Sequence, residues 1–241
     1  MRLFLFSLFM FLNSTLLAQT IKIATYNLRY ANTTDVGNLW TERKHAVVDL
    51  IQYHQFEIFG VQEAVKLQLE DLKNAMPVFD YYGVGRDDGK SAGEHSSIFY
   101  KRERFELLDK GDFWLSQTPE RPGFGWDSKF NRICSWVKLK DKKTKKVFFV
   151  FNAHYDHQGM VARVESSKLV LKKIKEIAVI SLETDGLPSE GFFCKKEISR
   201  DYSTIKTITQ TSTSYKTILT STFSKEGYLQ TTKDSSEISV T

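Results

Sequence analysis

The sequence predicts an α/β fold in which β-sheet structure is covered by helices. Short segments of alternating apolar and polar residues, which are typical of strands, recur along the chain up to His154. Two segments with apolar residues at helical spacing interrupt them, and a longer one follows. Apolar residues make up 41% of the 241 residues, which is the share of a globular protein with a substantial core.

The first part of the predicted domain alternates strands with helices. Residues 21–27 alternate apolar and polar side chains and indicate a strand. Residues 40–53 carry apolar residues at helical spacing and predict a helix. Residues 58–62 form a short, mostly apolar run of the kind found in a sheet covered on both faces. Residues 66–76 predict a second helix, which ends before Pro77.

The next part is rich in predicted strands, which are separated by turns rich in Gly, Pro and Asp. These strands are predicted over residues 81–85, 97–101, 105–113, 133–139 and 147–154. Residues 158–178 then predict a long amphipathic helix. The order of elements therefore favours a sheet with helices on its outside.

The two ends of the chain differ from this domain. A positive Arg2, an apolar run over residues 3–12 and a cleavage point after Ala18 predict a secretory signal peptide over residues 1–18, with an uncleaved anchor as the alternative. We therefore expect a secreted or periplasmic protein with no membrane span after cleavage. The domain is predicted over residues 19–198. Nearly half of residues 199–241 are Ser or Thr, which predicts a divergent or disordered tail.

The charge and the cysteine content of the chain do little to narrow the class of substrate or the kind of site. The formal charge of +5 is modest, so it permits an anionic substrate without indicating nucleic-acid binding. Cys134 lies in an alternating apolar segment and is predicted to be a buried thiol. Its pairing with Cys194 in an exported protein is the alternative. The Cys and His spacings do not indicate a zinc site.

Polar side chains stand at the ends of several predicted strands, where a scaffold can hold them rigidly. Asn27 ends the first strand and could bind a phosphate oxygen, although Asn also ends strands as a turn former. Glu63 follows an apolar strand and could bind a hard cation such as Mg²⁺, or cap the next helix. His154, flanked by Asn152 and Asp156, could donate a proton to a leaving oxygen if a carboxylate orients it. A structural histidine is the alternative.

Together these stretches resemble the endonuclease/exonuclease/phosphatase superfamily. The stretches that match are Thr25-Tyr26-Asn27-Leu28-Arg29, Gln62-Glu63, Gly93-Glu94-His95 through Tyr100, and Asn152-Ala153-His154-Tyr155-Asp156-His157. Residues 85–89, 113–116 and 131–132 are similar to stretches of secreted bacterial members. The match runs from about residue 21 to residue 178. The resemblance implies a four-layer α/β sandwich, with two packed β-sheets flanked by helices and incomplete at the C-terminus.

The resemblance also implies a Mg²⁺- or Mn²⁺-dependent phosphoesterase. It implies that Glu63 is the principal metal ligand, that Asn27 helps to hold the metal-bound phosphate, and that Arg29 binds substrate. The implied catalytic group comprises His154, Glu94, Asn152 and Asp156. Within it, His154 stabilises or protonates a phosphate or leaving-group oxygen, and Glu94 orients that histidine.

Two motifs of the family lack a recognisable counterpart in this sequence. The counterpart of Gly-Asp-x-Asn nearest in position contains Glu183 and Asp185, which are weak site candidates with an ordinary acidic loop as the alternative. No Asp-His pair follows, because the last histidine is His157. A reading-frame slip and a natural divergent end both account for this. We therefore expect low or absent activity and an open sheet edge.

Two further hypotheses stay open beside the phosphoesterase. One is a non-catalytic, degenerate family member that binds an anionic ligand or a partner. The other is an extracellular adhesion or structural domain. The substrate is undecided between nucleic acid, a phospholipid headgroup and a sugar phosphate. Trp114 and Trp126 could line a sugar or headgroup site, or belong to the core. We expect a monomer.

Overall fold

The computed structural model describes side chains for residues 20–178. Its described backbone covers residues 20–179, 193–198, 203–210, 216–223 and 229–234. The predicted signal peptide and the weak candidates Glu183 and Asp185 lie outside the described residues. Within the described part, no helix combines the length and apolar character that crossing a bilayer requires.

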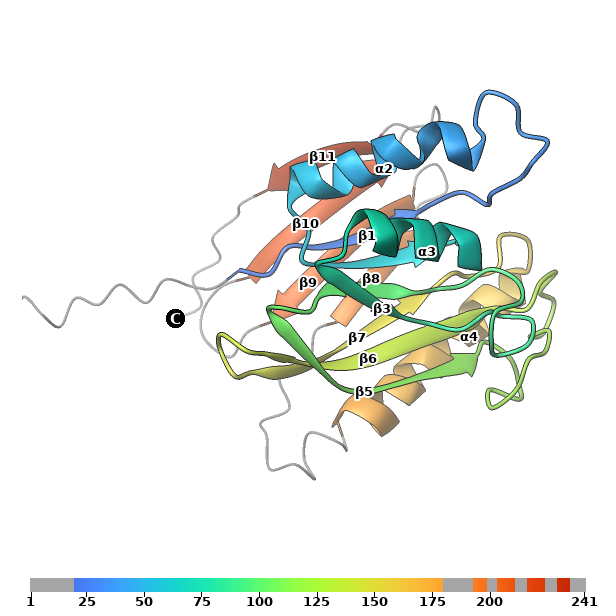
Figure 1. The fold of residues 1–241 in the computed structure, drawn as a ribbon. Helices are drawn as coiled ribbons and strands as arrows, with labels where there is room; N and C mark the ends of the chain where they lie inside the picture. Colours follow the sequence, from blue (N-terminus) through green and yellow to red (C-terminus); the bar gives the residue numbers. More distant parts are fainter. Residues whose placement is uncertain (1–19, 180–192, 199–202, 211–215, 224–228, 235–241) are drawn as a thin grey trace, which may run out of the picture.

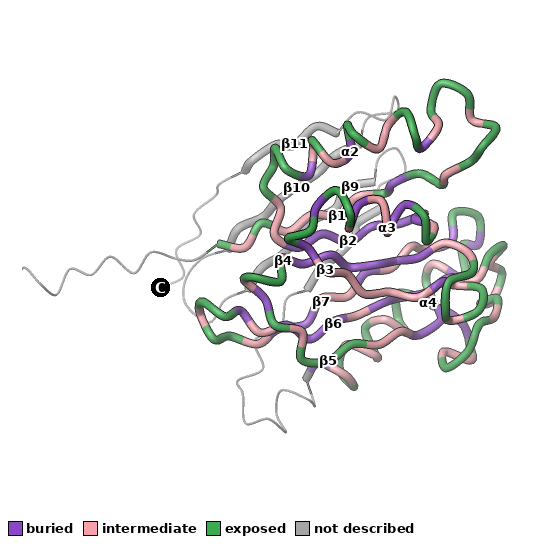
Figure 2. Tube along the Cα trace, in the orientation of Figure 1, coloured by how far each residue is buried: buried purple, intermediate pink, exposed green. Residues whose placement is uncertain are grey.

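The first sheet has strand order β1-β2-β4-β3. Its strands are β1 (Ile23–Asn27), β2 (Ile58–Gln62), β4 (Ile98–Lys101) and β3 (Phe79–Tyr82). β1 and β2 are parallel, whereas β4 is antiparallel to both of its neighbours. All five residues of the inner strand β2 are buried, as the short apolar run predicts (Figure 2).

Helices α2 (Trp40–His54) and α3 (Lys66–Ala75) cover one face of this sheet (Figure 1). Alternation along β2 points Phe59 and Val61 to the helices, and both side chains are fully buried. Phe59 stacks on Phe99 of β4 with ring centroids 4.8 Å apart. The helices contribute Trp40, Val47, Ile51, Leu69 and Leu72 to the same core.

The second sheet is antiparallel, with order β5-β6-β7. Its strands are β5 (Phe105–Trp114), β6 (Ile133–Asp141) and β7 (Val147–Ala153). Its inner face packs against the face of the first sheet that is turned away from α2 and α3. The core between the sheets contains Ile58, Ile98, Tyr100, Phe105, Val137, Leu139 and Phe148.

Helix α4 (Met160–Ile174) covers the outer face of the second sheet, and a π-helical turn, η1 (Lys175–Val179), continues it (Figure 1). Leu169 and Val170 of α4 pack against Phe113, Cys134 and Phe151 of the sheet. The order helices, sheet, sheet, helix confirms the predicted four-layer α/β sandwich. Cys134 is a free, fully buried thiol, as predicted.

A further antiparallel sheet has order β11-β10-β9-β8. Its strands are β8 (Phe193–Ile198), β9 (Ser203–Gln210), β10 (Lys216–Phe223) and β11 (Leu229–Asp234). The stretches between these strands, and residues 235–241, lie outside the described residues. A divergent or disordered tail over residues 199–241 therefore stays a prediction.

Two predicted boundaries are corrected, and both corrections affect the site. The strand predicted over residues 81–85 runs from Phe79 to Tyr82 and ends before Gly83, which has φ of 146° and where a Cβ would lie 2.7 Å from Ser97 Cα. The strand predicted to include His154 ends at Ala153. His154 therefore lies in the loop that follows the strand, instead of on the sheet.

Candidate active site

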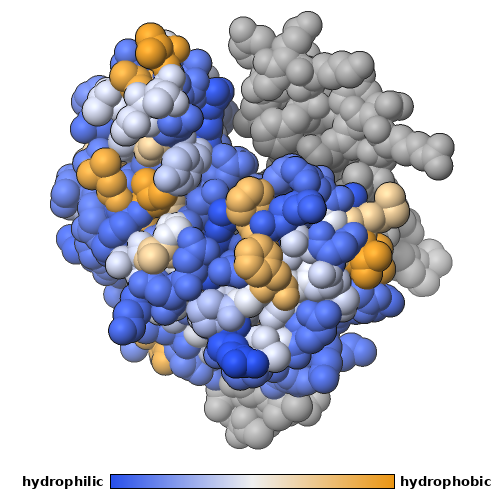
Figure 3. Space-filling view, turned by 90° about the vertical axis from the view of Figure 1, so that its right-hand side faces the viewer, coloured by the Kyte–Doolittle hydropathy of each residue, from blue (hydrophilic) through white to orange (hydrophobic). Residues whose placement is uncertain are grey.

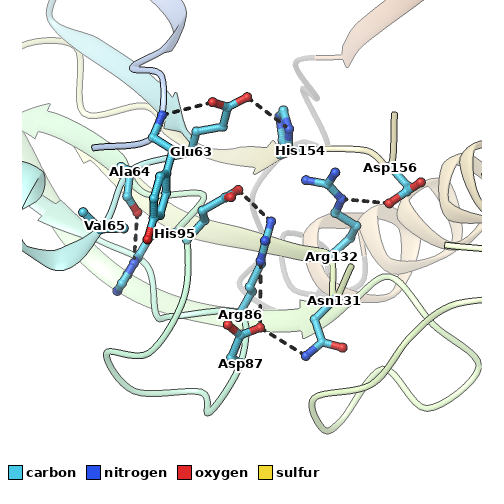
Figure 4. Close-up of polar contacts among 12 residues, drawn as sticks. Glu63, Ala64, Val65, Arg86, Asp87, His95, Asn131, Arg132, His154 and Asp156 are labelled. Carbon is cyan, nitrogen blue, oxygen red and sulfur yellow. Dashed lines mark hydrogen bonds and ion pairs between the residues drawn. The ribbon is translucent and has the colours of Figure 1, made fainter. Parts of the chain in front are cut away.

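A polar pocket lies at the end of the sandwich where β2 and β7 finish (Figure 4). It is lined by Glu63, Arg86, Glu94, His95, Ser96, Arg132, Ile133 and His154. Glu63 comes from the first sheet and His154 from the second, and 3.8 Å separates Glu63 Oε1 from His154 Nε2. The structure thus brings together the two side chains on which the predicted site depends. This end of the molecule is mostly hydrophilic at its surface, with separate small apolar patches (Figure 3).

The backbone turns sharply where it delivers Glu63. Glu63 follows β2 directly and has φ of 58°, in the left-handed region that non-glycine residues seldom adopt. Its Oε1 accepts a hydrogen bond of 2.8 Å from Asn27 Nδ2, and its Oε2 accepts one of 3.1 Å from the Tyr30 amide. The carboxylate is therefore held at the pocket by the loop that follows β1.

Glu63 is held in its charged form. Burial alone would raise the pKa of Glu63, but the hydrogen bonds from Asn27 and the Tyr30 amide outweigh it. His154 and Arg132 favour the ionised form as well, so the pKa of Glu63 lies below its ordinary value. An ionised, half-buried carboxylate is suited to bind a cation.

Asn27 positions Glu63 in this structure. While its Nδ2 donates to Glu63, its Oδ1 accepts a hydrogen bond of 2.8 Å from the Arg29 amide. Arg43 of α2 donates to the carbonyls of Leu28 and Arg29 and so fixes the same turn. The Arg29 side chain is 58% exposed and pairs with Asp35 at 2.7 Å. Asn27 and Arg29 do not line the pocket, and their binding roles stay predictions.

Asn152 joins the two sheets beneath the pocket. Its Nδ2 donates to the carbonyls of Val61, at 2.9 Å, and Ser97, at 3.0 Å. Its Oδ1 accepts a hydrogen bond of 2.7 Å from Gln62 Nε2. Gly60 makes room for it, since a Cβ there would lie 2.7 Å from Asn152 Cγ. Asn152 is buried, so it supports the strand that carries Glu63, and its predicted catalytic role stays a prediction.

Asp156 is engaged with the backbone at the start of α4. Its Oδ1 accepts from the amides of Gln158, at 3.0 Å, and Gly159, at 2.7 Å, and its Oδ2 accepts from Lys129 N at 3.1 Å. Burial alone would raise the pKa of Asp156, but these amides and Arg132 hold it far below its usual range. Asp156 also contacts Arg132 Nε at 3.4 Å, so it acts on the pocket through that arginine.

Glu94 lies at the pocket but is paired with an arginine. Arg86 Nη1 donates to Glu94 Oε2 at 2.6 Å. Burial raises the pKa of Glu94 above its ordinary value, with Glu63 adding to the effect and the two arginines Arg86 and Arg132 opposing it. That Glu94 orients His154 stays a prediction.

The two arginines of the pocket, Arg86 and Arg132, were given no role by sequence reasoning. Both lie in stretches that carry the resemblance, in a turn rich in Gly and Asp and directly before β6. Trp114 donates from Nε1 to the Arg86 carbonyl at 2.7 Å and is itself buried. Trp114 is therefore a core residue that supports Arg86, which was the alternative to a ligand-lining role.

Comparisons with known proteins agree with this geometry. No family model matches the chain. The solved structure of a mannosyl-6-phosphatase from Bacteroides thetaiotaomicron is 45% identical, covers 75% of this chain and 68% of that chain, and has a TM-score of 0.69. An endonuclease/exonuclease/phosphatase family protein from the same organism is 51% identical, with a TM-score of 0.65. This chain belongs to the endonuclease/exonuclease/phosphatase superfamily.

The match to relatives is partial in length. The match to the Bacteroides thetaiotaomicron family protein includes 66% of this chain and 57% of that protein's chain. An uncharacterized protein of Acanthamoeba polyphaga mimivirus is 29% identical over 142 residues, which are 56% of this chain and 52% of that protein. The chain thus spans about half the length of this curated relative. The D. rerio TDP2 structure, at 14% identity and a TM-score of 0.54, shows the shared fold alone.

Members of this superfamily are generally dependent on a divalent metal. The described residues contain no cluster of three or more His, Cys, Asp or Glu side chains able to hold a metal. Mg²⁺ commonly takes only one or two carboxylates and completes its shell with water and substrate oxygens. Each Glu63 oxygen accepts one hydrogen bond and so keeps a lone pair for a cation. The pocket therefore fits Mg²⁺ through Glu63.

Proposed function

We propose that this chain carries the site of a Mg²⁺-dependent phosphatase that hydrolyses sugar phosphate monoesters. The observation that carries the proposal is the convergence of Glu63 and His154, 3.8 Å apart, from two different sheets onto one pocket. The likeness to a mannosyl-6-phosphatase at 45% identity supports a phosphorylated sugar over nucleic acid or a phospholipid headgroup. The modest positive charge is compatible with a small anionic substrate.

In this proposal Glu63 binds the cation and His154 transfers a proton. Glu63 is kept ionised by Asn27 and the Tyr30 amide, and so offers a fixed ligand for a cation. When bound, Mg²⁺ offsets negative charge on the phosphoryl oxygens and makes water a better nucleophile. His154 lies at the same pocket and donates a hydrogen bond or a proton to a phosphoryl or leaving-group oxygen.

The second candidate function is binding without catalysis. It is favoured by the sequence after α4, in which Gly-Asp-x-Asn and a later Asp-His pair have no recognisable counterpart. Under this alternative the pocket retains a phosphorylated ligand but does not cleave it. Saturable binding of mannose 6-phosphate, together with no Mg²⁺-dependent phosphate release, is the result that distinguishes it.

The test is the release of inorganic phosphate from mannose 6-phosphate, with Mg²⁺ and with a chelator. We expect slow release that requires Mg²⁺, because part of the family's machinery is unmatched in the sequence. His154→Gln should lower the rate about 100-fold, the usual contribution of a proton-transfer group. Glu63→Gln should abolish the Mg²⁺-dependent release of phosphate, because the proposed ligand for the cation is lost.

A matched control is Asn74→Ala, an exposed position on α3 outside the pocket, which should leave the rate unchanged. Turnover that is insensitive to both Glu63→Gln and His154→Gln rejects the assignment. Faster hydrolysis of bis-p-nitrophenyl phosphate than of p-nitrophenyl phosphate, which has the same leaving group, would contradict the preference for monoesters.

A further inference from the structure

Two buried arginine side chains meet at the inner wall of the pocket. The side chain of Arg86 is 11% exposed and that of Arg132 is 5% exposed. Both guanidinium groups lie over the ring of Phe130, with Cζ to centroid distances of 5.1 Å and 5.5 Å. Both cations thus contact one aromatic ring. They line the pocket that also contains Glu63 and His154 (Figure 4).

The acidic partners leave much of this positive charge available. Asp156 accepts hydrogen bonds from the amides of Lys129, Gln158 and Gly159. Its Oδ2 lies 3.4 Å from Arg132 Nε, which is a long hydrogen bond. No hydrogen-bond partner for Arg132 Nη1 exists among residues 20–178.

Arg86 makes one close contact with a carboxylate, to Glu94, and a longer ion pair of 3.9 Å from its Nε to Asp87 Oδ1. Its Nη1 donates to Glu94, whereas its buried Nε has no hydrogen-bond acceptor among the residues with described side chains. Burial and the nearby charge of Arg86 lower the pKa of Arg132. An anion between the two cations would offset their like charges.

We propose that Arg86 and Arg132 form a clamp for the non-bridging oxygens of a terminal phosphate, and that this clamp restricts the site to phosphate monoesters. The proposal deepens the function proposed above and rests on it. A guanidinium group presents paired N–H donors that match two oxygens of one phosphate. A monoester offers three non-bridging oxygens and a second negative charge, so it can occupy both arginines and still face Glu63. A diester offers only two such oxygens and a single charge.

A purely structural role for the two arginines is the competing explanation, because Arg86 pairs with Glu94 and Arg132 with Asp156. The two explanations differ in what they predict for a free ligand. A structural role changes thermal stability without changing the preference between anions. A clamp changes the affinity for phosphate and the discrimination between monoester and diester.

The test uses binding to the wild-type protein, measured by isothermal titration calorimetry in a chelator, with inorganic phosphate, methyl phosphate and dimethyl phosphate as ligands. We expect methyl phosphate to bind at least about tenfold more tightly than dimethyl phosphate, which corresponds to about 1.4 kcal/mol. Equal affinities for the two esters would overturn the proposal. This arm needs no variant, so it does not depend on whether buried arginines can be replaced.

The variants Arg86→Lys and Arg132→Lys keep the charge but lose the paired donors. Each should weaken inorganic phosphate binding about tenfold. Arg102→Gln is the matched control, because Arg102 follows β4 at the end of the sheet opposite the pocket. Phosphate affinity unchanged in both Lys variants, with melting temperatures near that of the wild type, contradicts the clamp.

Failure of the clamp and failure of the proposed function give different results. If mannose 6-phosphate is not hydrolysed but phosphate binding depends on both arginines, the clamp is supported and catalysis is rejected. If hydrolysis depends on Glu63 and His154 while the Lys variants bind phosphate as the wild type does, the clamp is rejected and the phosphatase is supported.

Discussion

Replacing Asn152 with Ala tests how the two sheets are joined beneath the pocket. The substitution removes three buried hydrogen bonds, of 2.7, 2.9 and 3.0 Å, that link β7 to β2 and to Ser97, the residue before β4. It leaves the carbonyls of Val61 and Ser97 without this donor, whereas Gln62 keeps its 3.0 Å hydrogen bond to Thr25 Oγ1. The strand that carries Glu63 then loses its tie to the second sheet.

The magnitude follows from the groups left unpaired. The Ser97 carbonyl keeps a hydrogen bond of 2.8 Å from the Val61 amide, so the Val61 carbonyl carries most of the loss. A buried polar group that loses its partner costs about 1–3 kcal/mol, so we expect the free energy of unfolding to fall by about 2 kcal/mol. In a chain of this size each kcal/mol lowers the melting temperature by about 2–4 °C. We therefore expect Asn152→Ala to melt about 4–8 °C below the wild type.

The assay is thermal unfolding followed by circular dichroism, with urea unfolding as a second measure. Asn152→Asp should be more destabilising than Asn152→Ala, because a carboxylate would face the carbonyls of Val61 and Ser97. Asn74→Ala, at an exposed position on α3, should change the melting temperature little. Equal melting temperatures for Asn152→Ala and the wild type would refute the role of Asn152 as the tie between the sheets.

Two other predictions follow from buried groups near the pocket. Burial raises the pKa of Asp112 in the folded state, although Ser135 and Tyr82 donate hydrogen bonds to it. Its contribution to stability is thus complete below its unfolded pKa and is lost as pH rises through its folded pKa. The free energy of unfolding of Asp112→Asn, measured with urea, should therefore rise relative to that of the wild type from about pH 4 toward neutrality. A difference in free energy between the two proteins that does not change with pH would contradict this. Gly60→Ala should cost about 1–3 kcal/mol, because its Cβ would overlap Asn152, and an unchanged urea midpoint would show that the sheets can move apart there.

Much of the site could be predicted because strand ends fix positions. The pattern of residues 58–62 predicts a buried strand, and a carboxylate directly after it has to emerge at the end of the sheet. The same reasoning places His154 on the last position of a strand, whereas the structure has it one residue past the end of β7. The pattern does not determine that these two strand ends meet, because their meeting depends on how the two sheets stack. Only the family resemblance implied that stacking.

The remaining features depend on contacts between segments that are distant in sequence. Alternation places Asn152 on one face of its strand, but its partners on β2 and β4 are fixed only when the sheets pack. Arg86 and Arg132 lie outside the strands, in loops with no periodic pattern, so their meeting at Phe130 has no signal in the sequence. The left-handed backbone at Glu63 is likewise unexpected for a glutamate.

The measurement that tests the central claim most directly is paramagnetic broadening of the histidine ring signals by Mn²⁺, observed by NMR. If a cation binds at Glu63, substoichiometric Mn²⁺ should broaden His154 strongly and leave His54 unchanged. His54 ends α2, beside the start of β2 and away from the pocket, so it serves as an internal control. Glu63→Gln should restore the His154 signal. Broadening of His154 that persists in Glu63→Gln, or none in the wild type, would contradict a metal site shared by these two side chains.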